Sequence, residues 1–216
     1  METESRRLSV LVIDDQPIVR RGIRALLSEW SDIKHIVEAP DGESGFREYV
    51  ESDPDIVLTD LSLPGISGFE TIRRIVARDG SAKILAFSDR DDTDFVTQAL
   101  KAGARGYLCK RCKLSILLDA LGHLASGNIY LEPEIAQRLA FEKTRGRNSP
   151  FANLTTREFE IFSLLADGLA SREIGLRLSL STKTVANYAT QIKNKLEVNS
   201  TAAIVRLAIR HGIVRA

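Results

Sequence analysis

Short apolar runs alternate with amphipathic helical patterns over the first 127 residues. The apolar runs are mostly rich in Val, Ile and Leu and cover residues 10–13, 33–37, 56–58, 84–87 and 106–109. Runs of this kind are typical of strands buried on both faces of a parallel sheet. Helical patterns occupy residues 17–27, 42–51, 68–79, 91–103 and 113–126. Strands that alternate with helices of this length predict an α/β doubly wound domain with a five-stranded parallel sheet.

A second, entirely helical pattern follows a polar break. After a helical stretch near 132–142, residues 143–150 are polar, basic and interrupted by Gly and Pro, which is typical of a linker. From residue 154 onward four short helical pieces predict a small all-α bundle. We therefore expect one domain at 1–128, a linker with a helical stretch at 129–152, and a second domain at 153–216.

Several predicted helix ends carry residues suited to those positions. Pro17 suits a first helical position, because it has no N–H to leave unpaired. Thr155 and Glu158 have the spacing of a capping box, and Gly168 stands where that helix is expected to end. Ser171, Ser181 and Ser200 are predicted to cap the three helices that follow. The first helix is expected to pack inward through Val19, Ile23, Leu26 and Leu27.

Charge divides the chain in nearly the same place. Residues 1–142 hold 18 Lys and Arg against 24 Asp and Glu, whereas residues 143–216 hold 12 against 5. The basic half is therefore a candidate to bind a polyanion. The chain has no uncharged apolar stretch long enough for a membrane span, and its first residues lack the apolar core of a signal peptide, so we expect a cytoplasmic protein with no membrane partner.

Acidic side chains lie at or just beyond the ends of two of the predicted strands. Asp14 and Asp15 follow the first strand and Asp60 follows the third, so their carboxylates are expected to meet at the carboxyl edge of the sheet. Such a cluster needs cations, because two unit charges 4 Å apart repel by about 4 kcal/mol at an effective dielectric of about 20. Lys110 after the fifth strand is one candidate, and Mg²⁺, which prefers oxygen ligands, is the other. A carboxylate beside two such cations is suited to attack a phosphoryl group.

Four motifs around this edge resemble the receiver domain of two-component response regulators. They are IDDQP at 13–17, LTDLSLPG at 58–65, FS at 87–88 and GYLCK at 106–110. The resemblance spans about residues 8–127 and implies a flavodoxin-like fold. It implies that Asp60 is the phosphoacceptor, with a sensor histidine kinase as donor. It also implies that Asp15, Asp60 and the backbone carbonyl of Ser62 bind Mg²⁺ directly, with Asp14 acting through water. Lys110 would pair with the phosphoryl group, Ser88 would move to bond it, and Tyr107 would follow inward.

The predicted third helix of the basic domain carries the residues suited to DNA. A tight turn at 178–181 separates it from the helix before it, as in a helix-turn-helix, whose second helix enters the major groove of double-stranded DNA. Lys183, Lys193 and Lys195 are candidates for phosphate contacts. Asn187 is suited to bidentate pairing with adenine.

The same segment resembles the LuxR-type helix-turn-helix. The matching positions are Leu154, Thr155, Arg157, Glu158, Ala166, Gly168, Glu173, Ile174, Leu178, Ser181, Thr184, Val185, Ile192, Lys195, Leu196 and Val198. The resemblance implies that Ala186, Asn187 and Thr190 face the bases and that Thr184 lies near the DNA backbone. It also implies a homodimer assisted by the last helix, about 200–211. Ala186 stands where the family often has Lys, and Tyr188 where it often has His.

Together the two resemblances point to the NarL/FixJ family of response regulators, which are transcription regulators and not enzymes. We expect the receiver, before phosphorylation, to mask the recognition helix or to hold the domains away from a DNA-competent arrangement. Two alternatives stay open. Asp89, where receivers commonly have a small residue, favours control by a ligand or partner instead of phosphate. A phosphohydrolase with an aspartyl-phosphate intermediate is the other, although Ser62 stands where such enzymes need a second Asp.

The two cysteines, Cys109 and Cys112, allow a thioredoxin-like redox pair. A buried thiol that closes a strand, with the second thiol in the following turn, is the interpretation we favour. A structural zinc site is disfavoured, because it needs four ligands and the three histidines lie far away in the sequence.

Overall fold

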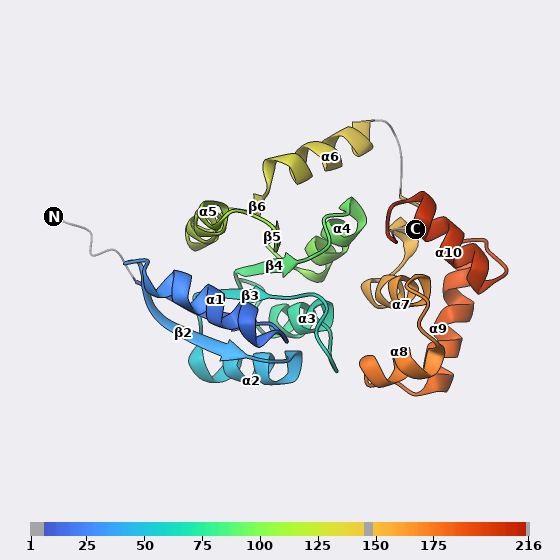
Figure 1. Ribbon diagram of the computed structural model, residues 1–216, viewed down its shortest axis with the longest axis horizontal. Coiled ribbons are helices and arrows are strands. Elements are labelled where there is room, and N and C mark those ends of the chain that lie inside the picture. The colour runs from blue at the N-terminus through green and yellow to red at the C-terminus, as the bar shows by residue number, and fades with distance from the viewer. Residues whose placement is uncertain (1–6, 145–148, 215–216) are drawn as a thin grey trace.

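The computed structural model describes residues 7–144 and 149–214, which form two domains (Figure 1). The first alternates strands and helices in the order β1 (Leu8–Ile13), α1 (Pro17–Ser28), β2 (Ile33–Ala39), α2 (Gly42–Ser52), β3 (Ile56–Thr59), α3 (Gly68–Arg78), β4 (Ile84–Ser88), α4 (Thr93–Ala102), β5 (Gly106–Cys109) and α5 (Leu114–Ala125). The sheet is parallel with the order β2-β1-β3-β4-β5, and this confirms the doubly wound α/β fold class.

Alternate side chains of the central strands enter two separate apolar layers. Leu11 and Ile13 of β1 pack with α2, α3 and α4 on one face, whereas Val10 and Val12 pack with α1 and α5 on the other. Because both faces are covered, β1, β3, β4 and β5 read as continuous apolar runs. The edge strand β2 is the exception, since among its residues only Ala39 is buried.

A sixth, two-residue strand extends the predicted sheet. β6 (Tyr130–Leu131) pairs in parallel with β5 and falls within the segment expected to be linker. The chain turns at Gly127, whose φ of 82° suits glycine, and the backbone N–H of Tyr130 then bonds to the carbonyl of Arg105. A strand this short carries no periodicity that a sequence could reveal. The helix α6 (Pro133–Thr144) follows it, close to the helical stretch expected there.

The second domain is a small helical bundle, as predicted. A short 3₁₀ turn, η1 (Pro150–Asn153), precedes α7 (Thr156–Ala166), α8 (Ser171–Arg177), α9 (Thr182–Lys195) and α10 (Thr201–Arg210). Its apolar side chains include Phe159, Phe162 and Ile192, each with no exposed surface. In the part of the chain that the structure describes, no helix is long and apolar enough to cross a bilayer.

Most of the predicted helix ends are confirmed. Thr155 and Glu158 form the reciprocal capping box, and the hydroxyls of Ser181 and Ser200 accept the expected backbone hydrogen bonds. The prediction for Ser171 is wrong. This residue is the first residue of α8, and Glu173 instead accepts a hydrogen bond from the backbone N–H of Ala170, so the carboxylate compensates for a start without a side-chain cap.

The two domains are docked against each other. α7 and α8 face the first domain, whereas α9 and α10 lie on the outer side of the bundle (Figure 1). The rings of Phe95 in α4 and Phe159 in α7 meet edge to face at 5.0 Å, and the backbone N–H of Gly65 bonds to the carbonyl of Arg177. The expectation that the receiver masks the recognition helix is therefore not met in this arrangement, since α9 points away from it.

The start of α3 lies unusually close to the end of β3. A Cβ at Gly68 would stand 1.9 Å from the carbonyl oxygen of Asp60 and 2.6 Å from the Cα of Leu61. Both neighbours are backbone, so they cannot yield as a flexible side chain would. Glycine at this position is what allows α3 to pack beside Asp60.

We expect Gly68→Ala to destabilise the first domain, because the added methyl forces the backbone after β3 to move, at a cost of about 1–3 kcal/mol. Urea denaturation measures the change in the free energy of unfolding. Gly122→Ala in α5 is the matched control, since its Cβ would meet nothing within 4 Å. That control should gain about 0.5–1 kcal/mol from the better helix propensity of alanine. Equal effects of the two substitutions would contradict the role of close approach.

Candidate functional site

The three predicted carboxylates converge at the carboxyl edge of the sheet. Asp14, Asp15 and Asp60 each offer an oxygen within 4.8 Å of the others. Asp14 and Asp60 are buried, and Asp15 is exposed. Asp14 lies beyond β1 and Asp60 lies beyond β3, and these two strands are neighbours at the point where the strand order reverses. This is where open α/β sheets bind their ligands.

Backbone hydrogen bonds continue the sheet ladders into the site. The N–H of Asp14 bonds to Ala39 O at 3.1 Å, that of Asp60 to Ile13 O at 2.8 Å, and that of Lys110 to Ser88 O at 2.8 Å. Each functional residue is therefore held by the strand beside it, although it stands outside the strand itself.

Lys110 lies between the two buried carboxylates. Its Nζ is 2.7 Å from Asp14 Oδ2 and 3.1 Å from Asp60 Oδ2, and its side chain is only 8% exposed. Among the described residues, neither Lys110 Nζ nor Asp14 Oδ2 has a neighbour with hydrogen-bond geometry, so charge attraction holds the contact. One ammonium thus faces two buried carboxylates and cannot neutralise both.

The pKa directions agree with this imbalance. Burial raises the pKa of Asp60 above its usual value, and the opposing attraction of Lys110 does not overcome it. Burial also acts to lower the pKa of Lys110, but Asp14 and Asp60 together raise it above its ordinary value. The lysine therefore stays charged, whereas Asp60 would ionise more readily beside a second cation.

These residues fit a hard divalent cation. Three carboxylates supply oxygen ligands within 4.8 Å of one another, and the one ammonium beside them leaves the net charge of the cluster negative. The acidic cluster is typical of the Mg²⁺ site of receivers. Ser62 follows Asp60 in the same turn, and its backbone donates a hydrogen bond to the Asp60 carboxylate.

Ser88 and Tyr107 lie next to this pocket. Ser88 is 1% exposed, and its hydroxyl accepts a hydrogen bond from the N–H of Arg90 at 3.3 Å. Tyr107 has no exposed surface, and its hydroxyl donates to the carbonyl of Arg90 at 2.7 Å. The inward position that the family resemblance assigns to the phosphorylated form is the one that Tyr107 occupies here.

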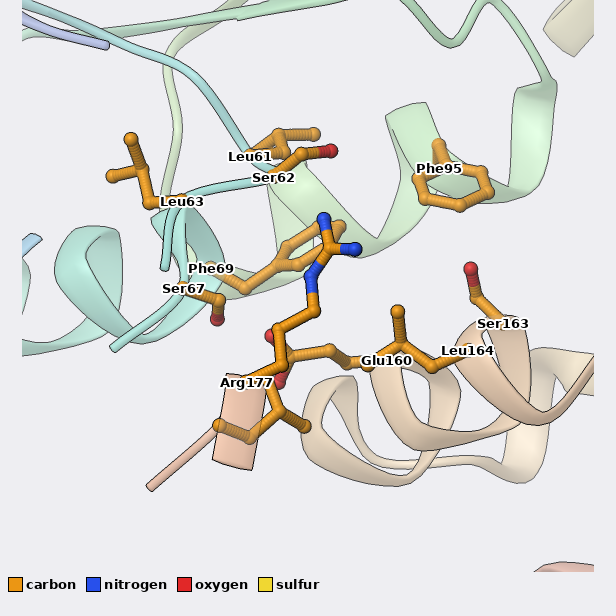
Figure 2. A pocket seen from close by; sticks show the side chains of 11 residues that line it. Leu61, Ser62, Leu63, Ser67, Phe69, Phe95, Glu160, Ser163, Leu164 and Arg177 are labelled. Carbon is orange, nitrogen blue, oxygen red and sulfur yellow. The ribbon is translucent and has the colours of Figure 1, made fainter. Parts of the chain in front are cut away.

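The turn after Asp60 also lines the junction between the domains. A cavity of about 40 Å³ lies between this turn, α4, α7 and α8, and Arg177 extends from α8 toward Leu61 and Ser62 (Figure 2). Below it, the buried carboxylate of Glu160 pairs with Arg157 at 2.6 Å and accepts a hydrogen bond from Ser67. Burial nevertheless raises the pKa of Glu160. The turn after Asp60 and the helical domain thus share one buried polar junction.

The predicted DNA contacts lie along α9. Four of them are exposed at a spacing that places them on one face of the helix: Lys183, Ala186, Asn187 and Thr190. Thr184 is partly buried and shares a 2.7 Å hydrogen bond with Ser181. Val185 and Ile192 fill the opposite, buried face.

The two remaining lysines differ in their surroundings. Lys193 is half-buried near the end of α9. Lys195 Nζ is 2.6 Å from Glu158 Oε2 and also bonds to the carbonyl of Asn153, so it ties the end of α9 to the start of α7. Its ammonium is therefore engaged within the domain, a contact that spacing along the chain did not indicate.

The cysteines behave as packing residues. Cys109 is the buried end of β5, and Cys112 lies in the turn that follows, with its N–H bonded to the carbonyl of Cys109. Burial raises the pKa of Cys112 to about 11. A redox-active pair needs a thiol of lowered pKa, so this environment disfavours that chemistry.

Family comparison assigns both halves. Residues 10–122 match the response regulator receiver domain, and residues 152–208 match the bacterial regulatory proteins of the luxR family. Among characterised relatives, the transcriptional activator protein ExaE of Pseudomonas putida is 38% identical over 96% of this chain and 99% of its own. The response regulator UvrY of Escherichia coli is 35% identical over 97% of both chains.

Solved structures agree with this assignment. The chain is similar to RcsB of Salmonella enterica bound to promoter rprA in the presence of phosphomimetic BeF₃⁻, with a TM-score of 0.71 and 25% identity over 93% of this chain and 98% of that one. A LuxR-family response regulator from Aurantimonas is 37% identical with a TM-score of 0.62, over 64% of this chain and 99% of that one. The chain thus belongs to the two-component response regulators that join a receiver domain to a LuxR-type helix-turn-helix, a family of transcription regulators and not of enzymes.

Proposed function

We propose that the protein controls transcription through phosphorylation of Asp60 and binding of double-stranded DNA by α9. The observation that carries the proposal is the position of Lys110. Its single ammonium lies between two buried carboxylates and cannot neutralise both of them. Such a site favours a phosphoryl group bound together with Mg²⁺, because the cation offsets the negative charge of the carboxylates and of the phosphoryl oxygens. A cytoplasmic location and a sensor histidine kinase as partner are parts of this proposal.

The pocket residues have distinct roles in phosphoryl transfer. An oxygen of Asp60 attacks the phosphorus of a phosphohistidine in the kinase, the P–N bond breaks with its electron pair returning to the imidazole, and an acyl phosphate forms. Mg²⁺, held by Asp14, Asp15, Asp60 and the Ser62 carbonyl, would neutralise charge on the phosphoryl oxygens. Lys110 pairs with the phosphoryl group, Ser88 supplies a hydroxyl to it, and Tyr107 fills the space behind Ser88.

The exposed face of α9 is suited to the major groove. Asn187 and Thr190 are placed to meet base edges, with Ala186 beside them, and Lys183 is placed to meet phosphates. Thr184, Lys193 and Lys195 lie toward the edges of this face, where the DNA backbone would run. The solved complexes of RcsB with promoter DNA support this assignment by similarity.

Control is proposed to act through the arrangement of the domains and the pairing of two copies. Masking of α9 by the receiver is not part of it, because α9 is already exposed in the docked arrangement. Moving a two-state equilibrium from 1:99 to 99:1 takes about 5.5 kcal/mol of differential interaction. Bonds from Lys110 and Ser88 to a phosphoryl group supply part of this, and formation of a homodimer on DNA, assisted by α10, supplies more.

Acetyl phosphate or a competent kinase should raise the intact mass of the protein by one phosphoryl group. Asp60→Asn should abolish the increase, because the amide is not a nucleophile for phosphorus. Asp119→Asn, an exposed position on α5, is the control and should leave the increase unchanged. If neither donor modifies the wild-type protein, control by a ligand or partner becomes the better hypothesis. Asp89 has an exposed side chain and would be the next residue to vary.

Mg²⁺ should stabilise the receiver against unfolding, by about 2.7 kcal/mol at 100 times its Kd. Asp15→Asn should weaken this effect without loss of folding, since that carboxylate is exposed. Lys110→Ala should strengthen Mg²⁺ binding, because it removes a competing cation, yet it should abolish the added stabilisation by BeF₃⁻. Denaturation with each ligand measures both effects. A loss of Mg²⁺ binding in Lys110→Ala would contradict the assignment.

DNA affinity should fall steeply with salt, with a slope of about −0.9 in log K against log salt for each phosphate contacted. Lys183→Ala should reduce that slope by about 1 and weaken all sequences alike. Asn187→Ala should instead cost about 1–3 kcal/mol on the preferred site, with that site first selected from random DNA. Lys34→Ala, an exposed lysine on β2, is the control. A flat salt response would count against groove binding.

A further inference from the structure

Arg90, in the loop between β4 and α4, joins the two domains. Its NH2 group lies 3.0 and 3.2 Å from the carboxylate oxygens of Asp167, at the end of α7, and its NH1 group donates to the carbonyl of Ile213. The guanidinium carbon also stands 5.0 Å from the ring centroid of Phe95. Phe95 in turn packs edge to face on Phe159 of α7. The side chain of Arg90 thus binds the helical domain at two separate points, and it also packs on the Phe95 ring that contacts Phe159 across the interface.

The backbone of the same residue is held by the switch residues of the pocket. Its N–H donates to the Ser88 hydroxyl and its carbonyl accepts from the Tyr107 hydroxyl. Only one residue separates Ser88 from Arg90, so displacement of the Ser88 side chain or backbone shifts the point from which the guanidinium reaches the other domain. Tyr107 is fully buried, which leaves its hydroxyl little freedom to follow a different geometry.

We propose that Arg90 is a positioning residue that transmits the state of the phosphoacceptor pocket to the docking of the DNA-binding domain. This inference rests on the proposed function of Asp60. A phosphoryl group there accepts a hydrogen bond from the Ser88 hydroxyl and draws it away from the Arg90 N–H that donates to it, and the backbone from Ser88 to Arg90 adjusts with it. Since an arginine fork binds in a fixed geometry, a small displacement at its root alters its bonds to Asp167 and Ile213.

The chain offers a matched control. Lys101 also crosses the interface, through a 3.0 Å hydrogen bond from its Nζ to the carbonyl of Ala152, but it lies at the far end of α4 from the switch residues. Asp167→Asn is the reciprocal variant. It removes the charge that Arg90 meets while leaving the receiver untouched, and therefore separates loss of coupling from damage to the pocket.

Hydrogen exchange of the full chain, with and without Mg²⁺ and BeF₃⁻, tests the proposal on the peptides of α7 and of the β4–α4 loop. Without ligand, Arg90→Ala and Asp167→Asn should both lose protection at the interface. With ligand, exchange of α7 should change by about 5-fold or more in the wild type, the lower end of usual allosteric coupling. In Arg90→Ala and Asp167→Asn the exchange of α7 should change by less than about 2-fold on addition of ligand. In Lys101→Ala it should change as much as in the wild type.

Unchanged interface protection in Arg90→Ala, or a retained ligand response in Asp167→Asn, would overturn the proposal. Loss of the ligand response in Lys101→Ala would also overturn it, because the response would then depend on interface contacts in general and not on Arg90. Thermal stabilisation by Mg²⁺ and BeF₃⁻ is measured in parallel on every variant. If the wild type binds neither, the proposed function fails together with the inference. If all variants bind both and α7 of the wild type does not respond, the inference alone fails.

Discussion

The receiver holds an unbalanced cluster of charges at the carboxyl edge of its sheet, and the packing of the strands keeps that cluster together. Asp14 and Asp60 are buried within reach of one another, and Lys110 is the cation the chain supplies to them. The three residues arrive there because β1, β3 and β5 run parallel and end at the same level. Every element that fixes those strand ends, from the ladder bonds to Gly68 beside Asp60, also fixes the distances on which the chemistry depends.

Much of this was predictable from the sequence because the signals are local. A strand covered on both faces leaves a continuous apolar run, and a parallel sheet brings the residues after such runs together. Asp14, Asp15, Asp60 and Lys110 could therefore be placed in one cluster from the sequence. The capping box of Thr155 with Glu158 and the exposed face of α9 follow from equally short patterns.

The features that the sequence did not reveal depend on contacts between distant segments. β6 is too short to show a period, and Lys195 looked like a free cation because Glu158 lies 37 residues away. The salt bridge between Arg90 and Asp167 spans 77 residues across two domains. Ser171 and Ala170 are both compatible with the start of α8, and the choice between them was settled by the position of Glu173. Domain boundaries drawn from composition remain predictions.

The docking of an acidic receiver on a basic helical domain has an electrostatic consequence. The two halves carry opposite net charges of similar size, and the whole chain has a formal charge of only +1. At physiological ionic strength fields fade over about 8 Å, so a distant polyanion meets a nearly neutral particle. Attraction grows only when α9 itself comes near. In the docked form, long-range attraction therefore adds little to the binding of nucleic acid of arbitrary sequence. The negative charge of the receiver compensates the positive charge of the lysines, so the distance between the two domains sets the nonspecific affinity for DNA.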